Sequence, residues 1–120
     1  MASLHDGRGD VQVVDVRNDG AVPDLPDDAV VEVPARIDRD GATPLPQAPL
    51  PPELRELVTT VKRYELLTVR AAMSGSRDDA LEALSANPLV GPRTDPRPLL
   101  DALLEANEGL LPRFFAAPRA

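Results

Sequence analysis

The feature that most limits what this chain can fold into is a proline-rich segment, PLPQAPLPP, which runs from Pro44 to Pro52. Proline lacks an amide hydrogen and restricts the residue before it, so this segment favours a stiff, extended connector. Apolar residues alternate with a period of two before the connector and recur every three or four positions after it. The sequence therefore predicts strands in the first part of the chain and helices in the second.

The first predicted strand is VQVVDV, from Val11 to Val16. This β-branched run is bounded by the turn residues NDG and indicates a strand with apolar contacts on both faces. The segment from Ala21 to Asp28 contains two prolines, which exclude a regular ladder. We therefore expect an ordered loop there.

The second predicted strand covers Ala29 to Ile37, where apolar and polar residues alternate. Pro34 has no amide hydrogen to donate to a neighbouring strand, and this favours an edge position for its strand. The sequence DRDG, Asp38 to Gly41, is typical of a tight turn. It leads into a third short strand near Ala42 to Leu45, so these two strands are expected to form a hairpin.

A long amphipathic helix is predicted from Glu53 onward. A second apolar row begins halfway along it, which indicates burial on more than one side and packing against a partner surface. The first row contains Leu54, Leu57, Val58, Val61, Tyr64, Leu67 and Ala71, and the second contains Leu66, Val69 and Met73.

Two shorter helices are predicted to follow. Gly75 is placed to end the long helix, and Ser76 with an aspartate three positions later resembles a capping pair. It would start a helix over Arg77 to Ala86, which the pair Asn87-Pro88 ends. A last helix is expected to begin near Asp95-Pro96 and to run toward Gly109.

Charge and cysteine content exclude several classes of function. The 120-residue chain carries a net charge of −7, which repels phosphate backbones, so a nucleic acid is not an expected partner. It has no cysteine, which excludes disulfides and thiolate metal sites and fits a reducing compartment. No apolar run reaches the roughly 20 residues of a membrane span. The predicted location is the cytoplasm.

The residues that perform chemistry in other enzymes are sparse in this sequence. The single histidine, His5, has no second histidine or cysteine with which to share a metal. The acidic pairs at Asp27-Asp28 and Asp78-Asp79 are expected in a loop and at a helix N-terminus, where carboxylates have structural roles. Tyr64 lies on the apolar row and is predicted to pack in the core. The sequence also lacks the glycine-rich phosphate-binding motifs.

Three co-linear blocks give a more specific indication. The segment VVDVRNDGAVPDLPDDAVVEVP, Val13 to Pro34, resembles the stretch that follows the catalytic core in glycoside hydrolase family 4, best in its 6-phospho-β-glucosidase branch. The segments Val61 to Gly91 and Leu99 to Phe114 resemble the helical part and the C-terminal helix of that family. Nearly the whole chain is covered, and Met1 to Asp10 is expected to match the end of a helix before the first strand.

The resemblance implies an NAD-dependent and manganese-dependent glycosidase that acts on a phosphorylated sugar by oxidation and elimination. In that family the NAD loop, the metal ligands and the catalytic tyrosine and aspartate all lie upstream of the part matched here. Asn18 and Gly20 match the family's Asn-x-Gly at a strand end, where the amide could face the substrate. Formation of a turn explains the same two residues equally well.

We therefore predict an α+β fold: a small mixed or antiparallel sheet with about three helices packed on one side, resembling the C-terminal domain of lactate and malate dehydrogenases. Residues 1–120 would form one C-terminal domain for substrate contact and oligomerisation, without the NAD-binding domain. The chain would be the C-terminal part of a 6-phospho-β-glucosidase and inactive alone. It would bind no NAD or Mn²⁺ by itself and would contribute no catalytic residue. Its partners would be the upstream domain or, through the helix Leu54–Met73, a second copy.

A different class of function stays open on the sequence. The chain could be a stand-alone interaction module, or the non-catalytic product of a truncated gene. A fragment of an enzyme should expose an apolar patch on the long helix, whereas an adapted stand-alone protein should cover that patch by dimerising.

Overall fold

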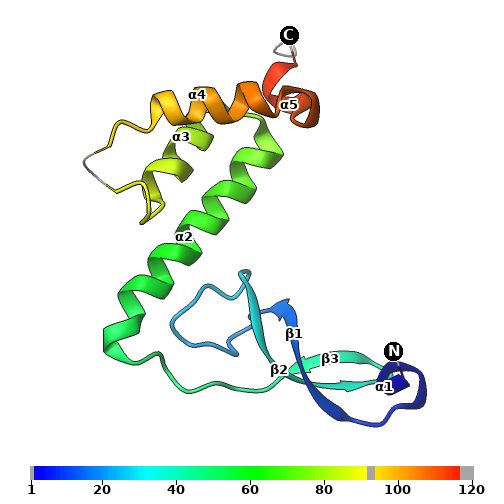
Figure 1. Cartoon of the computed structure of the whole chain (residues 1–120). Coiled ribbons are helices and arrows are strands. Elements are labelled where there is room, and N and C mark those ends of the chain that lie inside the picture. Colours follow the sequence, from blue (N-terminus) through cyan, green and yellow to red (C-terminus); the bar gives the residue numbers. More distant parts are fainter. Residues whose placement is uncertain (1, 92–93, 117–120) are drawn as a thin grey trace. The chain divides into compact units, whose positions relative to one another are not determined.

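The computed structural model describes residues 2–91 and 94–116, which separate into two compact units, Met1–Arg55 and Glu56–Ala120. Each unit is described by itself. The first contains a short helix and three strands: α1 (Ala2–Asp6), β1 (Asp10–Arg17), β2 (Val30–Asp38) and β3 (Gly41–Pro44). The second is helical. The predicted α+β class is confirmed. After the short α1, all strands precede the connector and the remaining helices follow it, as the change of hydrophobic period predicts (Figure 1).

The sheet of the first unit is antiparallel throughout, with the strand order β1-β2-β3 (Figure 1). All three strands lie where the sequence predicts them, to within two residues. The predicted hairpin between β2 and β3 forms through Arg39 and Asp40, and the backbone amide of Asp40 donates to the Asp38 carboxylate at 3.0 Å. Gly41 follows with φ 120°, a backbone conformation that residues with a side chain rarely adopt.

The small core of the first unit lies on one face of β2. Alternate residues of that strand are buried, as the period of two predicts: Val31, Val33, Ala35 and Ile37. Val22 from the β1–β2 loop completes the buried cluster, and partly buried residues pack around it: Val16, Leu25 and Leu50. The loop and the connector therefore cover this face of the sheet.

The prediction that Pro34 puts its strand at the edge is wrong, because β2 is the central strand. The residue is tolerated there for two reasons. In an antiparallel pair, hydrogen-bonded and non-hydrogen-bonded residue pairs alternate along the strands. Asn18 and Ala29 are hydrogen-bonded, so by this alternation Val13 and Pro34 form a non-hydrogen-bonded pair and β1 needs no amide from Pro34. On the other side β3 ends at Pro44, and the carbonyl of Pro34 still accepts from the Leu45 amide at 2.9 Å.

The prediction of apolar contacts on both faces of β1 is also wrong for this chain. Val11 and Val13 are exposed at 55% and 61%, while Val14 and Val16 on the core face are half-buried. The β-branched run Val11–Val16 has valines at both odd and even positions, and this indicated apolar contacts on both faces. In the structure the loop and the connector cover only one of its faces.

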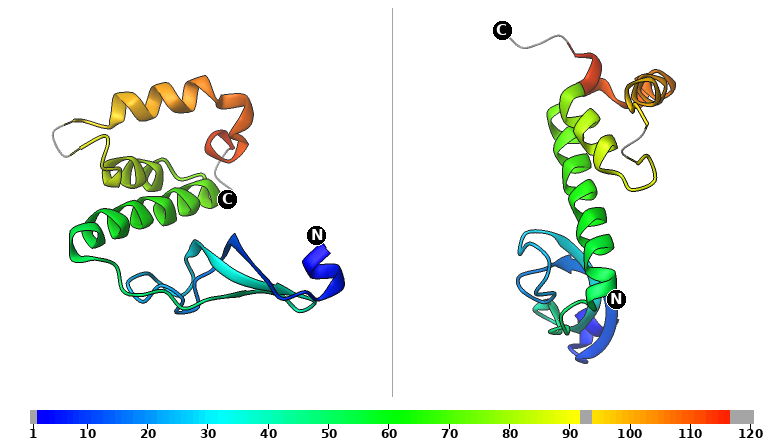
Figure 2. Two further views of the ribbon diagram at one scale, coloured as in Figure 1. Left: turned by 60° about the horizontal axis from the view of Figure 1, so that its bottom comes forward. Right: turned by 90° about the vertical axis from the view of Figure 1, so that its left-hand side faces the viewer.

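The second unit is built on three helices, α2 (Pro52–Ser74), α3 (Arg77–Ala86) and α4 (Arg97–Ala106) (Figure 2). Helix α2 begins at the end of the first unit, directly after the extended connector. Ser76 caps α3 as predicted, since its Oγ accepts from the backbone amide of Asp79 at 3.2 Å. The bounds of α3 are the predicted ones.

The last predicted helix is shorter than expected. It starts two residues after Asp95, whose carboxylate accepts from the Arg97 amide at 3.1 Å, and ends at Ala106 instead of Gly109. A short 3₁₀ turn, η1 (Glu108–Leu110), and a helical turn, α5 (Pro112–Phe115), follow it. Pro112 cannot donate an amide bond to a continuing helix, and this favours the break.

The two apolar rows of α2 have different environments. Leu67 and Ala71 of the first row are buried and Val58, Val61 and Tyr64 are half-buried, whereas Leu54 and Leu57 at its start are exposed. The second row lies at the surface of this chain, with Leu66 exposed at 37%, Val69 at 61% and Met73 at 66%. None of the described helices is long and apolar enough to cross a membrane.

Candidate functional site

Asn18 stands at the end of β1, where the sequence places a candidate substrate contact, and it is fully buried. Its side-chain Nδ2 donates to the carbonyls of Val22, Leu25 and Pro26 at 3.1, 2.9 and 3.1 Å. Its Oδ1 accepts from the Val22 amide at 2.7 Å. The amide group is thus bonded to the β1–β2 loop on all sides.

This bonding explains how a proline-containing loop keeps a fixed shape without a ladder. Buried backbone groups must be paired, and Pro23 and Pro26 offer no amide hydrogens for that purpose. The Asn18 side chain replaces the missing ladder partners. A substrate contact by this side chain stays a prediction, and it would require the amide to exchange one of its loop bonds.

Gly20, the second candidate, lies at the surface of the same turn. Its φ is 83°, and Asp19 before it also has a positive φ of 42°. The turn is closed by a bond from the Ala21 amide to the Asn18 carbonyl at 2.7 Å. No atom lies within 4 Å of a Cβ built on Gly20, so the glycine is required here by backbone conformation and not by a crowded neighbour. Its predicted substrate contact is likewise untested.

Asp24 is a residue of this loop that sequence reasoning missed. Its carboxylate accepts from the Leu50 amide at 2.6 Å and pairs with Arg55 Nε at 2.8 Å, and its side chain is only 14% exposed. It therefore ties the loop to the connector and to the first turn of α2. Its partners lie some thirty positions away, and no local pattern in the sequence predicts them.

The acidic pair at the start of α3 has the structural role predicted for it. The Asp79 carboxylate accepts from Ser74 Oγ at 2.7 Å and pairs with Arg70 at 3.1 Å. Arg70 also donates to Glu82, and this hydrogen bond, with Asp79 adding to it, raises the pKa of Arg70 above its usual value. A permanently charged arginine makes this cluster an ion-pair network and not an acid or base.

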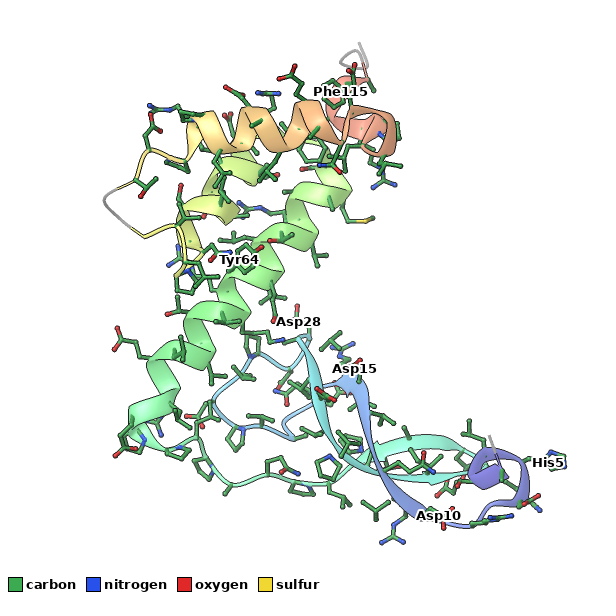
Figure 3. The ribbon with its side chains drawn as sticks, viewed as in Figure 1. His5, Asp10, Asp15, Asp28, Tyr64 and Phe115 are labelled. Carbon is green, nitrogen blue, oxygen red and sulfur yellow. The ribbon has the colours of Figure 1, made fainter. Side chains whose placement is uncertain are left out.

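The described residues do not fit either NAD or manganese. His5 is exposed on α1 (Figure 3), and no group of three potential ligands among residues 2–91 and 94–116 could hold a metal ion. The glycine-rich cradle of a dinucleotide is not present in the sequence either. What the first unit offers is a shaped loop.

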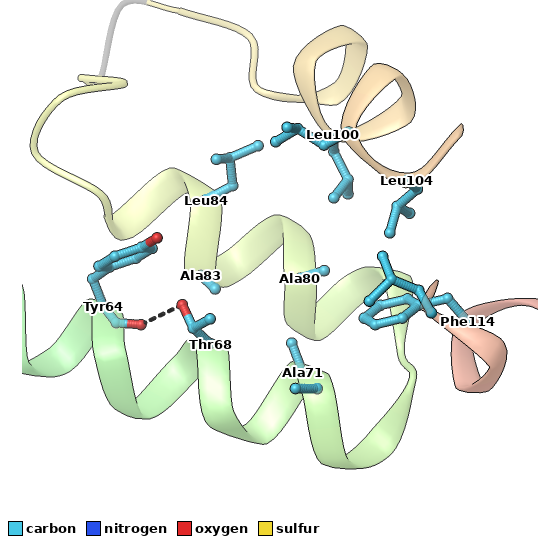
Figure 4. A pocket seen from close by; sticks show the side chains of 12 residues that line it. Tyr64, Thr68, Ala71, Ala80, Ala83, Leu84, Leu100, Leu104 and Phe114 are labelled. Atoms are coloured by element: carbon cyan, nitrogen blue, oxygen red, sulfur yellow. Dashed lines mark hydrogen bonds between the residues drawn. The ribbon is translucent and has the colours of Figure 1, made fainter. Parts of the chain in front are cut away.

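The second unit contains an apolar pocket of about 220 Å³ between its helices (Figure 4). Tyr64 lines it and is half-buried, in agreement with its predicted place in the apolar core. Two other side chains that line it, Leu100 and Leu104, are among the buried residues of this unit. The pocket offers apolar contact and no ionisable carboxylate.

Comparison with known families gives a match over most of the chain. Residues 1–90 match the model described as "Family 4 glycosyl hydrolase C-terminal domain". The match covers both the Asn18 loop and the helices α2 and α3.

Curated relatives agree with this match. The chain is 36% identical over 115 residues to a "Probable 6-phospho-beta-glucosidase" of Bacillus subtilis, covering 96% of this chain and 26% of that protein. It is 35% identical over 107 residues to a 6-phospho-beta-glucosidase of Thermotoga maritima, covering 89% of this chain and 26% of that protein. The chain spans about a quarter of the length of the relatives it matches.

Solved structures share the fold at the same coverage. A 6-phospho-alpha-glucosidase from gut microorganisms, in complex with NAD and glucose-6-phosphate, matches 91% of this chain with 25% of its own, at 33% identity and a TM-score of 0.84. The Thermotoga maritima 6-phospho-beta glucosidase with NAD and glucose-6-phosphate matches 91% of this chain with 27% of its own, at 34% identity and a TM-score of 0.81.

Proposed function

Because the chain belongs to glycosyl hydrolase family 4, whose C-terminal domain it matches, we propose that it is the C-terminal part of a 6-phospho-β-glucosidase. The observation that carries the proposal is the match of nearly the whole chain to about a quarter of each relative. Together with the remaining three quarters of that enzyme, the chain would form the protein that hydrolyses a phosphorylated glycoside.

The role proposed for this part is to shape a cleft. Asn18 and Asp24 fix the β1–β2 loop from inside, so the loop surface around Gly20 is available to a ligand without a cost of ordering. The described residues fit neither NAD nor manganese, so the proposal assigns both groups to the rest of the enzyme. A solved structure of the Thermotoga maritima 6-phospho-beta glucosidase, which is similar to this chain, contains both manganese and NAD⁺.

The β specificity rests on the relatives that combine high identity with long matches. Proteins named 6-phospho-beta-glucosidase match at 34% to 36% identity over 102 to 115 residues. Two named for 6-phospho-alpha- or phospho-alpha-glucosidase activity match at 31% and 32%, and an alpha-glucosidase of Erwinia rhapontici matches at 36% over only 81 residues. The margin is small, and a similar solved structure is a 6-phospho-alpha-glucosidase. The anomer is therefore a part of the proposal that needs its own test.

The exposed second row of α2 supports a role inside a larger protein. Leu66, Val69 and Met73 form an apolar stripe that this chain leaves at its surface. We assign it to contact with the remainder of the enzyme. If instead the purified chain formed a discrete dimer that covered the stripe and bound no apolar dye, the stand-alone interaction module would be favoured. The proposed location remains the cytoplasm, which a chain without cysteine fits.

A chimera tests the function directly. The matching C-terminal segment of the Thermotoga maritima enzyme would be replaced by this chain, and hydrolysis of 6-phospho-β- and 6-phospho-α-glucosides measured with NAD and Mn²⁺. We expect β-glucoside turnover within about tenfold of the parent, and none in the control that ends before the segment.

Two outcomes of this assay would contradict the proposal. A folded chimera without turnover would show that the chain cannot complete the enzyme. A chimera that prefers the α-glucoside would support membership of a working family enzyme and contradict the proposed β specificity.

A further inference from the structure

The apolar pocket of the second unit is lined by none of the residues to which the proposed function assigns a role. It is a partly open hollow lined by α2, α3, α4 and the segment that carries α5, all of which belong to the same compact unit. Figure 4 shows Tyr64 at one end and Phe114 at the other, with Ala80 and Ala83 between them. The pocket is thus an elongated space with an aromatic ring at each end.

The space exists because small side chains meet at the junction of α2 and α3. Ala71, Ala80 and Ala83 line one side, and Leu100 and Leu104 of α4 line the side opposite (Figure 4). The hollow that these side chains leave has a volume of about 220 Å³ and is partly open to solvent. Larger residues in place of the alanines would fill it.

The end formed by Phe114 is held in place by contacts of the neighbouring backbone. Arg113 Nη1 donates to the Met73 carbonyl at 2.9 Å, at the C-terminal end of α2. Gly75 allows this approach, since a Cβ at that position would lie 2.3 Å from the Arg113 carbonyl oxygen. The wall is therefore part of the folded unit, as is usual for pockets that bind small molecules.

The lining selects against charged ligands. None of the residues that line the pocket carries a charged side chain, so a phosphorylated sugar would lose its hydration without gaining a counter-charge. Polar groups are limited to the hydroxyls of Tyr64 and Thr68, and Thr68 Oγ1 already donates to the Tyr64 carbonyl at 2.9 Å. The Tyr64 hydroxyl is left to orient one polar group of a ligand.

From these features we propose that the pocket is a binding site for a neutral aromatic molecule with one polar substituent, of the size of phenol or cresol. A closed apolar cavity of about 150 Å³ is enough to hold benzene, so a partly open apolar hollow of about 220 Å³ has room for a substituted ring. The two terminal aromatic rings offer edge or stacking contacts to it. The lining of the pocket shares no residue with the β1–β2 loop, around which the proposed function places the ligand surface.

The test is a titration of the 120-residue chain with phenol and p-cresol, monitored by NMR through the amide and methyl chemical shifts. We expect saturable shifts at Ala71, Ala83 and Leu104, with a Kd on the order of 1 mM or tighter for a ligand of this size. Tyr64→Phe should weaken phenol binding by about three- to tenfold and leave toluene binding unchanged, because only one hydrogen bond is removed.

Ala80→Leu fills the pocket and is the decisive variant. It should abolish binding and leave the chain folded or more stable, whereas Ala102→Leu, the same substitution on the exposed face of α4, should keep wild-type binding. Binding that survives Ala80→Leu, or the lack of saturable shifts in the wild-type chain, would overturn the proposal. So would an unfolded chain, or pocket shifts that follow protein concentration instead of phenol, since a second copy would then occupy the space.

Discussion

The two units of this chain solve the problem of burial in different ways. The first unit, Met1–Arg55, has a core of small β-branched residues fixed by polar side chains, with Asn18 fully buried among loop carbonyls. The second unit, Glu56–Ala120, has amphipathic helices that leave a partly open apolar pocket between them and carry an apolar stripe at the surface. Hydrogen bonds of buried polar side chains fix the shape of the first unit, and contacts at the ends of the helices fix that of the second.

This difference indicates where each unit depends on the rest of a larger protein. The first unit satisfies its own buried polar groups and keeps one face of β1 open. The second leaves Leu66, Val69 and Met73 without a cover in this chain. We therefore expect substitutions at fixed points to have large effects on stability and substitutions in the stripe to have almost none.

The largest effect is expected at Gly75. Its φ is 70°, and a Cβ would lie 2.3 Å from the Arg113 carbonyl oxygen, so Gly75→Ala combines backbone strain with a clash against backbone. We expect a loss of about 3–4 kcal/mol in the free energy of unfolding, measured by urea denaturation of the chain.

Gly91 is the matched control for this change. It has nearly the same φ, 71°, but a Cβ added there would meet no atom of residues 2–91 and 94–116 within 4 Å beyond its chain neighbours, so Gly91→Ala should cost only about 1 kcal/mol. Equal losses at the two positions would show that α5 does not pack against Gly75.

Asn18→Ala should have the next largest effect, because it leaves the Val22 amide and the Leu25 carbonyl without their partner. The Pro26 carbonyl loses one of two bonds and still accepts from the Ala29 amide. The expected loss is about 2–3 kcal/mol by chemical denaturation. Asn107→Ala removes one bond, from Nδ2 to the Leu103 carbonyl, and should cost less than about 1 kcal/mol. If both asparagines cost the same, the contrast between the units would fail.

How far the sequence predicts this structure depends on the range of the contacts involved. The strands, the hairpin and α3 follow from local patterns, such as the period of two in β2 and the Ser76 cap, and these are confirmed. The position of β2 in the sheet is not local. Pro34 alone favoured an edge, and only the register with β1 and the end of β3 explains its central place.

The candidate site was predicted in the same uneven way. The match to the family's Asn-x-Gly identified Asn18, but its bonds to three loop carbonyls depend on how residues 22–26 turn back. Asp24 was missed because its partners, Leu50 and Arg55, follow the connector. The pocket depends on packing among four segments, which spacing along one helix does not reveal.

A smaller effect is expected at the start of α3. Ser76→Ala removes the side-chain acceptor of the Asp79 amide and should cost about 1 kcal/mol. Ser85→Ala in the same helix should change stability by less than about 0.5 kcal/mol, since Ser85 Oγ only donates to the Leu81 carbonyl within the helix. Thermal unfolding followed by circular dichroism measures both, and a Ser85 effect as large as that of Ser76 would exclude capping as the cause.

The smallest effect on stability is expected from replacing the stripe. The triple variant Leu66→Gln, Val69→Gln, Met73→Gln should change the stability of the chain by less than about 0.5 kcal/mol, because these side chains are already exposed. In the chimera with the Thermotoga maritima enzyme the same variant should lower the yield of folded, active protein. Arg63→Gln on the same helix is the control, and a large loss of stability in the isolated chain would mean that the stripe is covered there.

The most direct measurement is turnover by the 120-residue chain itself. A chromogenic 6-phospho-β-glucoside would be incubated with the purified chain, NAD and Mn²⁺. We predict a rate equal to the buffer control, because this part supplies shape and contact surface and depends on the remaining three quarters for chemistry. Saturable hydrolysis that scales with chain concentration and persists through further purification would contradict it.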